Sequence, residues 1–347
     1  MTRHTDVVVV GGGQAGLAAG YYLRRAGIDF TILDAQSSPG GAWQHGWDSL
    51  HLFSPAAYSS LPGRLMPPQA GKAFPDVSHL LEYLADYEKR YELPIQRGVR
   101  VEALRDQAPF LRVETDSGAF TARAVINATG TWWRPFLPAV PGREHFQGRQ
   151  HHTVDYRSPW DYAGQRVLVV GGGNSGAQVA ADLAPHATVR WVTQRPARYL
   201  PDEIDGSALF TLATQRVQSG GPRISDLGDI VAVPPVRAAR DAGLIPDHRM
   251  FDSLTADGAR WPDGSTWPCD AIIWCTGFRP ALSHLSPLAL RTEGGRIPTE
   301  GTRAVADPRI HFLGYGDWTG PASATLIGVG RTARDAAREI AELLGRR

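Results

Sequence analysis

Two stretches of the chain repeat one pattern of apolar and polar positions. Each has an apolar run, a glycine-rich turn, an alanine-rich amphipathic stretch and a second apolar run, within residues 1–35 and 166–195. The two turns have nearly the same sequence, GGGQAG at 11–16 and GGGNSG at 171–176. A short apolar run bounded by turn residues predicts a buried strand, and the amphipathic stretch predicts a helix. The sequence therefore predicts two βαβ units.

The rest of the chain contains regular and irregular segments. Helical spacing of apolar residues predicts an amphipathic helix over 76–93. Residues 36–75 are rich in Pro, Gly, Ser and aromatic residues and show no long element, and an irregular segment of this length is usually functional. The other predicted elements are strands around 99–105, 110–115 and 119–127, a hairpin around 263–264, a strand from 310 towards Gly316-Asp317, and a final helix over 323–344.

Each glycine-rich turn predicts a dinucleotide site. In the pattern G-x-G-x-x-G after a strand, the first glycine permits the tight turn, the second lets the backbone approach a pyrophosphate, and the third lets helix and strand pack closely. The pyrophosphate then faces the positive end of the helix dipole. One match is weak evidence because it can be a plain turn between strand and helix. Two matches in the same context indicate two dinucleotide sites.

The residue after the second apolar run distinguishes the two sites. Asp34 ends this run in the first unit, and a carboxylate there accepts hydrogen bonds from ribose hydroxyls and repels a 2′-phosphate, so FAD or NAD is expected. The same offset in the second unit falls on Gln194, followed by Arg195. Arg195 offers a cation for the 2′-phosphate of NADPH, although arginine is also common as a solvated surface charge. Gln194 leaves room for NADH, so both coenzymes stay open. One flavin site and one exchangeable nicotinamide site indicate a flavoprotein oxidoreductase.

The order of the segments predicts that the second unit is inserted into the first. In each unit a strand ends in a Thr-Gly turn, Thr129-Gly130 or Thr276-Gly277, which we expect at the mouth of the dinucleotide cleft. The predicted fold class is α/β, with two Rossmann-like dinucleotide-binding domains, each with a β-meander, and the NAD(P)H domain inserted into the FAD domain. The expected boundaries are 1–138 and 281–347 for the FAD domain and 139–280 for the NAD(P)H domain.

Composition limits the class of protein. The chain has 347 residues, 42% hydrophobic and 20% charged, which suits two globular domains. A formal net charge of +1 argues against nucleic acid or a membrane surface as a partner. No apolar run approaches the ~18 residues of a membrane span, and we expect no signal peptide because the first strand begins so early. The two cysteines, Cys269 and Cys275, lie in or beside an apolar run, which favours a cytoplasmic location, and they form no C-x-x-C pair of the thioredoxin-reductase type.

The segment between the two units carries a family resemblance. Residues 146–157 (FQGRQHHTVDYR) fit F-x-G-x-x-x-H-x-x-x-[YF]-[KR] at every fixed position. This pattern is the fingerprint of the flavin-containing monooxygenases. With both glycine turns, both Thr-Gly turns and Gly316-Asp317, the chain resembles class B of that family over nearly its whole length. It is most similar to a short bacterial subgroup known for accepting both NADH and NADPH. In Baeyer–Villiger monooxygenases the pattern usually ends in Trp-Pro or Trp-Asp, where this chain has Tyr156-Arg157.

The resemblance implies roles for individual residues. The glycines of 11–16 hold the FAD pyrophosphate, Gly41 and Trp43 lie along the flavin, and the backbone of Val101 meets the adenine. Asp317 hydrogen-bonds the ribityl chain. Many members place an asparagine over the flavin, but residues 50–54 contain none, and Phe53 is expected in that place. This departure puts the protection of the oxygenated flavin in doubt.

The candidate site residues form three groups. The expected cofactor-binding residues of the first site are Gly11, Gly13, Gln14, Ala15, Gly16, Asp34, Ala35, Gln36, Gly41, Ala42, Trp43, His51, Val101, Thr129, Gly130, Gly316, Asp317 and Ile327. Those of the second site are Gly171, Gly173, Asn174, Ser175, Gly176, Gln194, Arg195, Cys275, Thr276 and Gly277. The expected catalytic residues are Phe53 and Asp317, and no metal ligand is expected.

The hypothesis for the reaction follows from the cofactors. NAD(P)H passes a hydride to the flavin, the reduced flavin and O2 form a C4a-(hydro)peroxide, and this oxidant transfers one oxygen to a sulfide or an amine. The protein keeps water away so that the peroxide does not collapse to H2O2. A small-molecule substrate and O2 are the expected partners, and a homodimer is a further hypothesis.

Other functions stay open at this point. A Baeyer–Villiger oxygenation of ketones or an NAD(P)H oxidase would use the same cofactors. A non-catalytic, flavin-binding redox sensor is a hypothesis of another class, and the intact second glycine turn argues against it. The physiological substrate is not predicted, because loop residues line such pockets and determine specificity.

Overall fold

The computed structural model describes residues 2–202, 208 and 230–346. The chain divides into two compact units. The first consists of Met1–Gln44, Ser54–Trp133 and Pro280–Arg347, and the second of His45–Phe53 and Arg134–Arg279. The main part of the second unit is thus inserted into the first. The short segment 45–53 also groups with the second unit, which the sequence pattern did not indicate.

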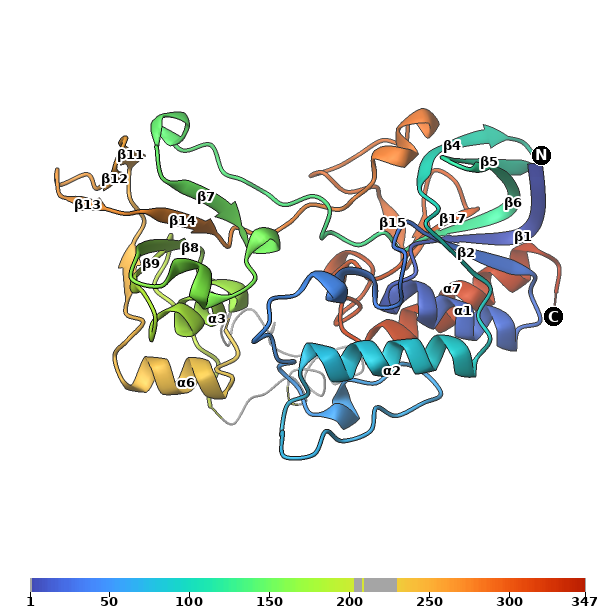
Figure 1. The fold of residues 1–347 in the computed structure, drawn as a ribbon. Coiled ribbons are helices and arrows are strands. Elements are labelled where there is room, and N and C mark those ends of the chain that lie inside the picture. The colour runs from blue at the N-terminus through green and yellow to red at the C-terminus, as the bar shows by residue number, and fades with distance from the viewer. Residues whose placement is uncertain (1, 203–207, 209–229, 347) are drawn as a thin grey trace. The chain divides into compact units, whose positions relative to one another are not determined.

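The first unit is built on a largely parallel sheet with helices on one side (Figure 1). Its elements are β1 (Thr2–Val10), α1 (Gln14–Arg25), β2 (Phe30–Asp34), α2 (Val77–Arg90), β3 (Ile95–Arg97), β4 (Val101–Gln107), β5 (Phe110–Thr115), β6 (Gly118–Asn127), β15 (Thr299–Glu300), β16 (Arg303–Ala304), β17 (Ile310–Phe312) and α7 (Val329–Leu343). The strand order is β15-β16-β17-β6-β1-β2-β3, and β4 and β5 continue from β6 as an antiparallel hairpin. Central β1 is covered on both faces, which is why residues 7–10 are a continuous apolar run.

The second unit repeats this plan with fewer strands (Figure 1). Its elements are β7 (Arg149–His152), β8 (Arg166–Val170), α3 (Asn174–Leu183), β9 (Thr188–Thr193), α6 (Pro234–Asp241), β10 (Asp247–Arg249), β11 (Ser253–Leu254), β12 (Gly258–Arg260), β13 (Thr266–Pro268) and β14 (Ala271–Trp274). The parallel order is β10-β9-β8-β14-β7, and β11, β12 and β13 form a separate antiparallel sheet. Short 3₁₀ helices of the two units are η1 (Gly41–His45), η2 (Ala56–Tyr58), η3 (Arg143–His145), η4 (Thr153–Asp155), η5 (Pro159–Tyr162), η6 (Ser283–Leu288) and η7 (Gly316–Trp318).

This is the predicted α/β architecture, with a three-stranded meander in each unit. The prediction of the last helix was wrong at its start, because α7 begins at Val329 and not at 323. Residues 320–328 form turns, in which the Ser323 N–H donates to the Gly320 carbonyl and the Gly328 N–H to the Thr325 hydroxyl. Strands β3 and β7 were not predicted. None of the described helices is long and apolar enough to cross a membrane.

A buried polar network closes the core of the first unit at the carboxyl end of β6. The Asn127 amide donates to the Tyr315 hydroxyl at 2.5 Å, and its oxygen accepts from His284 Nε2 at 2.6 Å. The Thr129 hydroxyl lies 2.9 Å from that of Tyr315 and donates to the Ala281 carbonyl at 2.7 Å. Burial lowers the pKa of His284 to about 4, so the imidazole is neutral near pH 7.

The pKa of His284 makes the stability of the fold depend on pH. Because the folded pKa lies below the ordinary value of 6.5, the unfolded chain takes up a proton between pH 6.5 and 4 that the folded chain refuses. The stabilisation is therefore present above pH 6.5 and is lost as the pH falls towards 4. In His284→Gln the amide still donates to Asn127 but does not titrate. The loss of unfolding free energy between pH 7.5 and 4.5 is expected to be about 2 kcal/mol smaller in this variant.

Chemical denaturation at a series of pH values measures this difference. His145→Gln removes a histidine whose side chain is 74% exposed, and it serves as the control with the pH dependence of the parent protein. If the stability curve of His284→Gln ran parallel to that of the parent, the buried imidazole would not be the cause.

Candidate functional site

The two glycine-rich turns fold alike. Gly11 and Gly171 have positive φ angles of +105° and +136°, which favour glycine. A β-carbon built on Gly16 would lie 1.9 Å from the Gly11 carbonyl oxygen, and one on Gly176 would lie 2.0 Å from the Gly171 carbonyl oxygen. Each helix therefore packs so closely on its turn that the third glycine of the pattern, Gly16 or Gly176, has no room for a side chain.

Each glycine turn also lies against the Thr-Gly turn of its own unit. A β-carbon on the first glycine would lie 2.5 Å from the Ala128 carbonyl oxygen in the first unit and 2.1 Å from that of Cys275 in the second. These residues directly precede Thr129-Gly130 and Thr276-Gly277, so the predicted pairs of turns are brought together. Burial raises the pKa of the Cys275 thiol to about 12, which leaves this side chain as a neutral packing group.

The amino ends of α1 and α3 are open to an anion. Gly13 and Gly173 are their N-cap residues, no side chain caps either helix, and neither first turn contains an acid. Helix α2 is different, because the Asp76 carboxylate accepts the His79 N–H at 2.9 Å. The first N–H groups of a helix have no partner within it, and the helix dipole favours a negative charge there. A β-carbon on Gly173 would meet nothing within 4 Å, so a ligand has room to approach the backbone. Both turns thus fit the pyrophosphate of a dinucleotide.

Gln14 joins the loops around the start of α1. Its Oε1 accepts from Trp43 Nε1 at 2.9 Å, and its Nε2 donates to the Ala324 carbonyl at 2.7 Å. A β-carbon on Gly41 would lie 2.7 Å from the Gly13 Cα. The loop that contains Ala42 and Trp43 therefore packs against the glycine turn. The predicted site residues of the loop and of the turn thus lie close together.

A second loop reaches the same helix. A β-carbon on Gly314 would lie 2.9 Å from the Ala15 Cβ, and the Ser323 hydroxyl donates to the Gly316 carbonyl at 2.8 Å. Asp317 in this loop is exposed, and Ile327 is half-buried. The carboxylate of Asp317 is thus available to a ligand.

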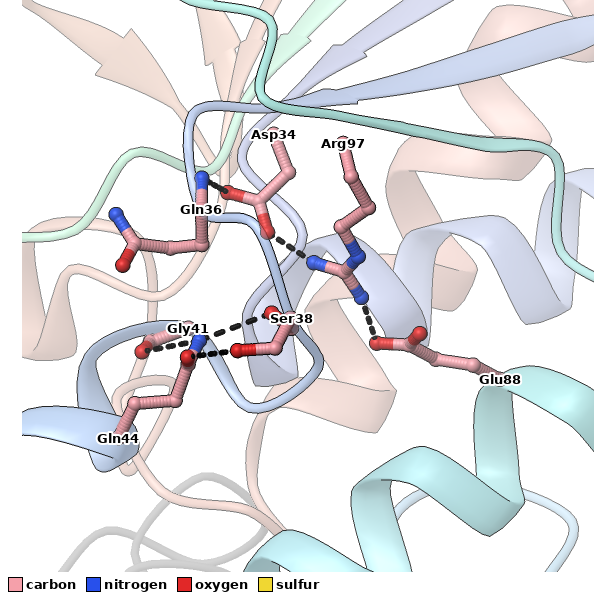
Figure 2. A network of polar contacts seen from close by, with 7 residues as sticks. All are labelled: Asp34, Gln36, Ser38, Gly41, Gln44, Glu88 and Arg97. Atoms are coloured by element: carbon pink, nitrogen blue, oxygen red, sulfur yellow. Dashed lines mark hydrogen bonds and ion pairs between the residues drawn. The ribbon is translucent and has the colours of Figure 1, made fainter.

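Asp34 is the last residue of β2, and Figure 2 shows the polar contacts of its carboxylate. Its side chain is buried, and a β-carbon on Gly12 would lie 2.7 Å from its Oδ2. The Gln36 N–H donates to Oδ1 at 3.3 Å, and the Arg97 guanidinium pairs with Oδ2. Two further predicted site residues are accessible. Ala35, the residue after Asp34, is exposed, and Val101, the first residue of β4, is half-buried.

The corresponding place in the second unit has no acid. Gln194 and Arg195 directly follow β9, and both are exposed. Trp191 Nε1 donates to the Gly171 carbonyl at 2.7 Å, and the Asn174 amide oxygen accepts the Val231 N–H at 2.8 Å. Asn174 therefore fixes a neighbouring segment, whereas Gln194 and Arg195 present polar groups to solvent at the edge of the turn.

The fingerprint segment begins with two packing residues. Phe146 is buried in the core of the second unit, and a β-carbon on Gly148 would lie 2.4 Å from its ring. His152 Nε2 lies 3.1 Å from the Gly277 carbonyl, to which it donates, while His151 Nδ1 lies 2.7 Å from the Tyr162 hydroxyl. The two adjacent imidazoles thus have separate partners, and His152 holds the second Thr-Gly turn.

The last two fingerprint residues hold α3 and the segment 45–53. The Tyr156 hydroxyl donates to Asp182 on α3 at 2.6 Å, and the Arg157 guanidinium donates to the His45 carbonyl at 2.8 Å. Phe53 packs against the core of the second unit, and His51 Nδ1 lies 2.7 Å from the carbonyl oxygen of Ser49. The predicted position of Phe53 over a flavin stays a prediction.

Comparison with known proteins identifies the family. Residues 8–220, more than half of the chain, match the family described as pyridine nucleotide-disulphide oxidoreductase. A flavin-containing monooxygenase from Stenotrophomonas maltophilia is 47% identical, with a TM-score of 0.92 over 99% of this chain and 100% of its own. The chain belongs to the flavin-containing monooxygenases.

Two further relatives agree with this assignment. An uncharacterised CzcO-like oxidoreductase of Geobacillus kaustophilus is 32% identical over 96% of this chain and 97% of its own. Indole-3-pyruvate monooxygenase YUCCA6 of Arabidopsis thaliana is 33% identical over 79% of this chain and 76% of its own. The family predicted from the fingerprint is confirmed, and this flavin-containing monooxygenase is an NAD(P)H-dependent flavoprotein with FAD and NAD(P)H as its cofactors.

The geometry of the second glycine turn predicts unequal effects of one methyl group. In this monooxygenase Gly176→Ala would place a carbon 2.0 Å from a backbone oxygen, so α3 must move, at a cost of about 3 kcal/mol or roughly 6–12 °C in Tm. Gly173, in the same turn, has a φ of −105°, and a β-carbon there would meet no neighbour within 4 Å. The Tm of Gly173→Ala is therefore expected to stay unchanged. Thermal unfolding measures both, and equal melting temperatures would contradict the close packing of the third glycine.

Proposed function

We propose that this monooxygenase holds FAD in its first unit and NAD(P)H in its second and transfers one atom of O2 to a soft nucleophile, a thioether sulfur or an amine nitrogen. The main support is the pair of glycine turns. In both, the helix packs closely on the turn, but the residues at the ends of the neighbouring strands β2 and β9 differ. The first has the buried carboxylate of Asp34, and the second has Gln194 and Arg195. An acid selects against a 2′-phosphate and a cation favours one, so the two turns suit different dinucleotides.

The roles of the site residues are part of this proposal. Residues 1–138 and 281–347, apart from 45–53, form the FAD domain. In it the start of α1 receives the pyrophosphate, Asp34 the ribose and Asp317 the ribityl chain. Residues 139–280 form the NAD(P)H domain, with the start of α3 as the phosphate site. The position of Phe53 over the flavin stays a prediction. A homodimer and a cytoplasmic location stay predictions.

The chemistry determines the class of substrate. A bound flavin supplies hydride acceptance and activation of O2, and the protein binds, orients and excludes water. The balanced reaction takes the substrate, O2, NAD(P)H and a proton to the oxygenated substrate, water and NAD(P)⁺. Because the transferred oxygen is electrophilic, the substrate supplies the electron pair, and sulfur and amine nitrogen hold such pairs. No protein nucleophile is needed for this transfer.

Product analysis tests the substrate class. The FAD-loaded enzyme is incubated with NADPH, air and methyl phenyl sulfide, a tertiary amine or cyclohexanone in parallel reactions. Sulfoxide or N-oxide that accounts for most of the NADPH consumed is the expected result. Hydrogen peroxide equal to the NADPH consumed, with no oxygenated product, would indicate an oxidase and contradict the proposal. If the lactone of cyclohexanone were the only oxygenated product in the three reactions, the enzyme would be a Baeyer–Villiger monooxygenase instead.

The choice of coenzyme gives a separate prediction at Arg195. If its guanidinium pairs with the 2′-phosphate, Arg195→Gln is expected to raise the KM for NADPH about tenfold, or about 1.4 kcal/mol, and to leave the KM for NADH unchanged. Steady-state kinetics with both coenzymes measure this. Arg166→Gln, at the amino end of β8 and away from the turn, serves as the control with both values unchanged. Equal changes for the two coenzymes would assign Arg195 to some other role.

A further inference from the structure

One charged cluster of the first unit includes residues that the sequence did not predict. Arg97 at the end of β3 pairs through its guanidinium with Asp34 at the end of β2 and with Glu88 on α2 (Figure 2). The side chains of Arg97, Asp34 and Glu88 are 19%, 7% and 12% exposed, so three charges are largely removed from water. The planar fork of a guanidinium reaches two carboxylates at once, which a lysine ammonium does less well.

Main-chain hydrogen bonds fix the place of this cluster. Asp34 and Arg97 are partners in the parallel register of β2 and β3. Just beyond them, the Asp34 carbonyl accepts the Val99 N–H at 3.0 Å, and the Gln36 carbonyl accepts the Gly98 N–H at 3.0 Å. Arg97 therefore approaches Asp34 from a neighbouring strand of the sheet, at a position that the backbone determines.

These contacts orient the Asp34 carboxylate. Oδ1 accepts the Gln36 N–H, Oδ2 pairs with Arg97, and Oδ2 also lies over Gly12 in the glycine turn. An ionised carboxylate has about four lone-pair positions. The two bonds use one position on each oxygen, and one on each oxygen is left for two further donors. The two hydroxyls of a ribose are such a pair of donors.

We propose that Arg97 is a positioning residue for the adenosine ribose of FAD, which acts through Asp34, and that Glu88 holds the other end of its guanidinium. This inference rests on the proposed function, which assigns Asp34 to that ribose. Without Arg97, two buried carboxylates would share this site with no cation between them, and one would take up a proton or turn away. Either change at Asp34 would withdraw an acceptor from the ribose.

The test is the affinity for FAD, measured without turnover. FAD is removed from the purified protein and titrated back while flavin fluorescence reports binding. Arg97→Met is expected to raise the Kd about tenfold, and Asp34→Asn at least as much. The double variant is expected to bind no more than about threefold more weakly than Asp34→Asn alone, because Arg97 has no carboxylate left to orient. Arg105→Met removes an exposed pair with Glu114 in the same unit and serves as the control with an unchanged Kd.

The outcomes separate the inference from the function on which it rests. Fully additive losses in the double variant, or an unchanged Kd in Arg97→Met, would overturn the role of Arg97. An unchanged Kd in Asp34→Asn would instead overturn the assignment of Asp34 to the ribose. If Arg97→Met does not fold, Arg97→Lys takes its place in the same cycle. It keeps a charge but loses the fork, and it is expected to raise the Kd about threefold.

Discussion

Each unit of this protein depends on one close approach, between the third glycine of a turn and the carbonyl oxygen of the first. A β-carbon would lie 1.9 Å from that oxygen in the first unit and 2.0 Å in the second. The helix therefore begins directly at the turn, and its first N–H groups have no partner within the helix. The N-cap residue of each helix is a glycine with no side chain, so an anion can reach the helix end. The proposed phosphate sites of both units rest on this arrangement of turn and helix.

The two sites differ through the residues at one strand end. Asp34 is buried, and a neighbouring strand supplies the cation that pairs with it. Gln194 and Arg195 are exposed, at the same offset from their turn. A paired, buried carboxylate has one fixed orientation, which suits a tightly held cofactor. Exposed polar side chains can adapt, which suits a coenzyme that exchanges in every turnover.

The sequence predicted the features that residue type alone determines. The glycines of the two turns, two apolar strands and the fingerprint at 146–157 can all be recognised from residue type. The first and third glycines of each turn are required because the fold leaves no room for a larger residue or needs a positive φ. The start of the last helix was not predicted, because hydrogen bonds of Ser323 and Thr325 in the preceding turns decide it. Strand β3 has three residues, too few to show a period, so the position of Arg97 beside Asp34 was not visible either. The grouping of 45–53 with the second unit rests on contacts between distant positions. Arg157 donates to the His45 carbonyl across 112 positions, and Trp47 is buried in the core of the second unit.

Anaerobic titration of the FAD-loaded protein with NADPH and with NADH tests most directly whether two dinucleotide sites cooperate in one chain. About one equivalent of either reductant is expected to abolish the flavin absorbance at about 450 nm. If the protein held FAD tightly but kept this absorbance in excess NADPH and NADH, the proposed function would be contradicted, because NAD(P)H would then not reduce the flavin.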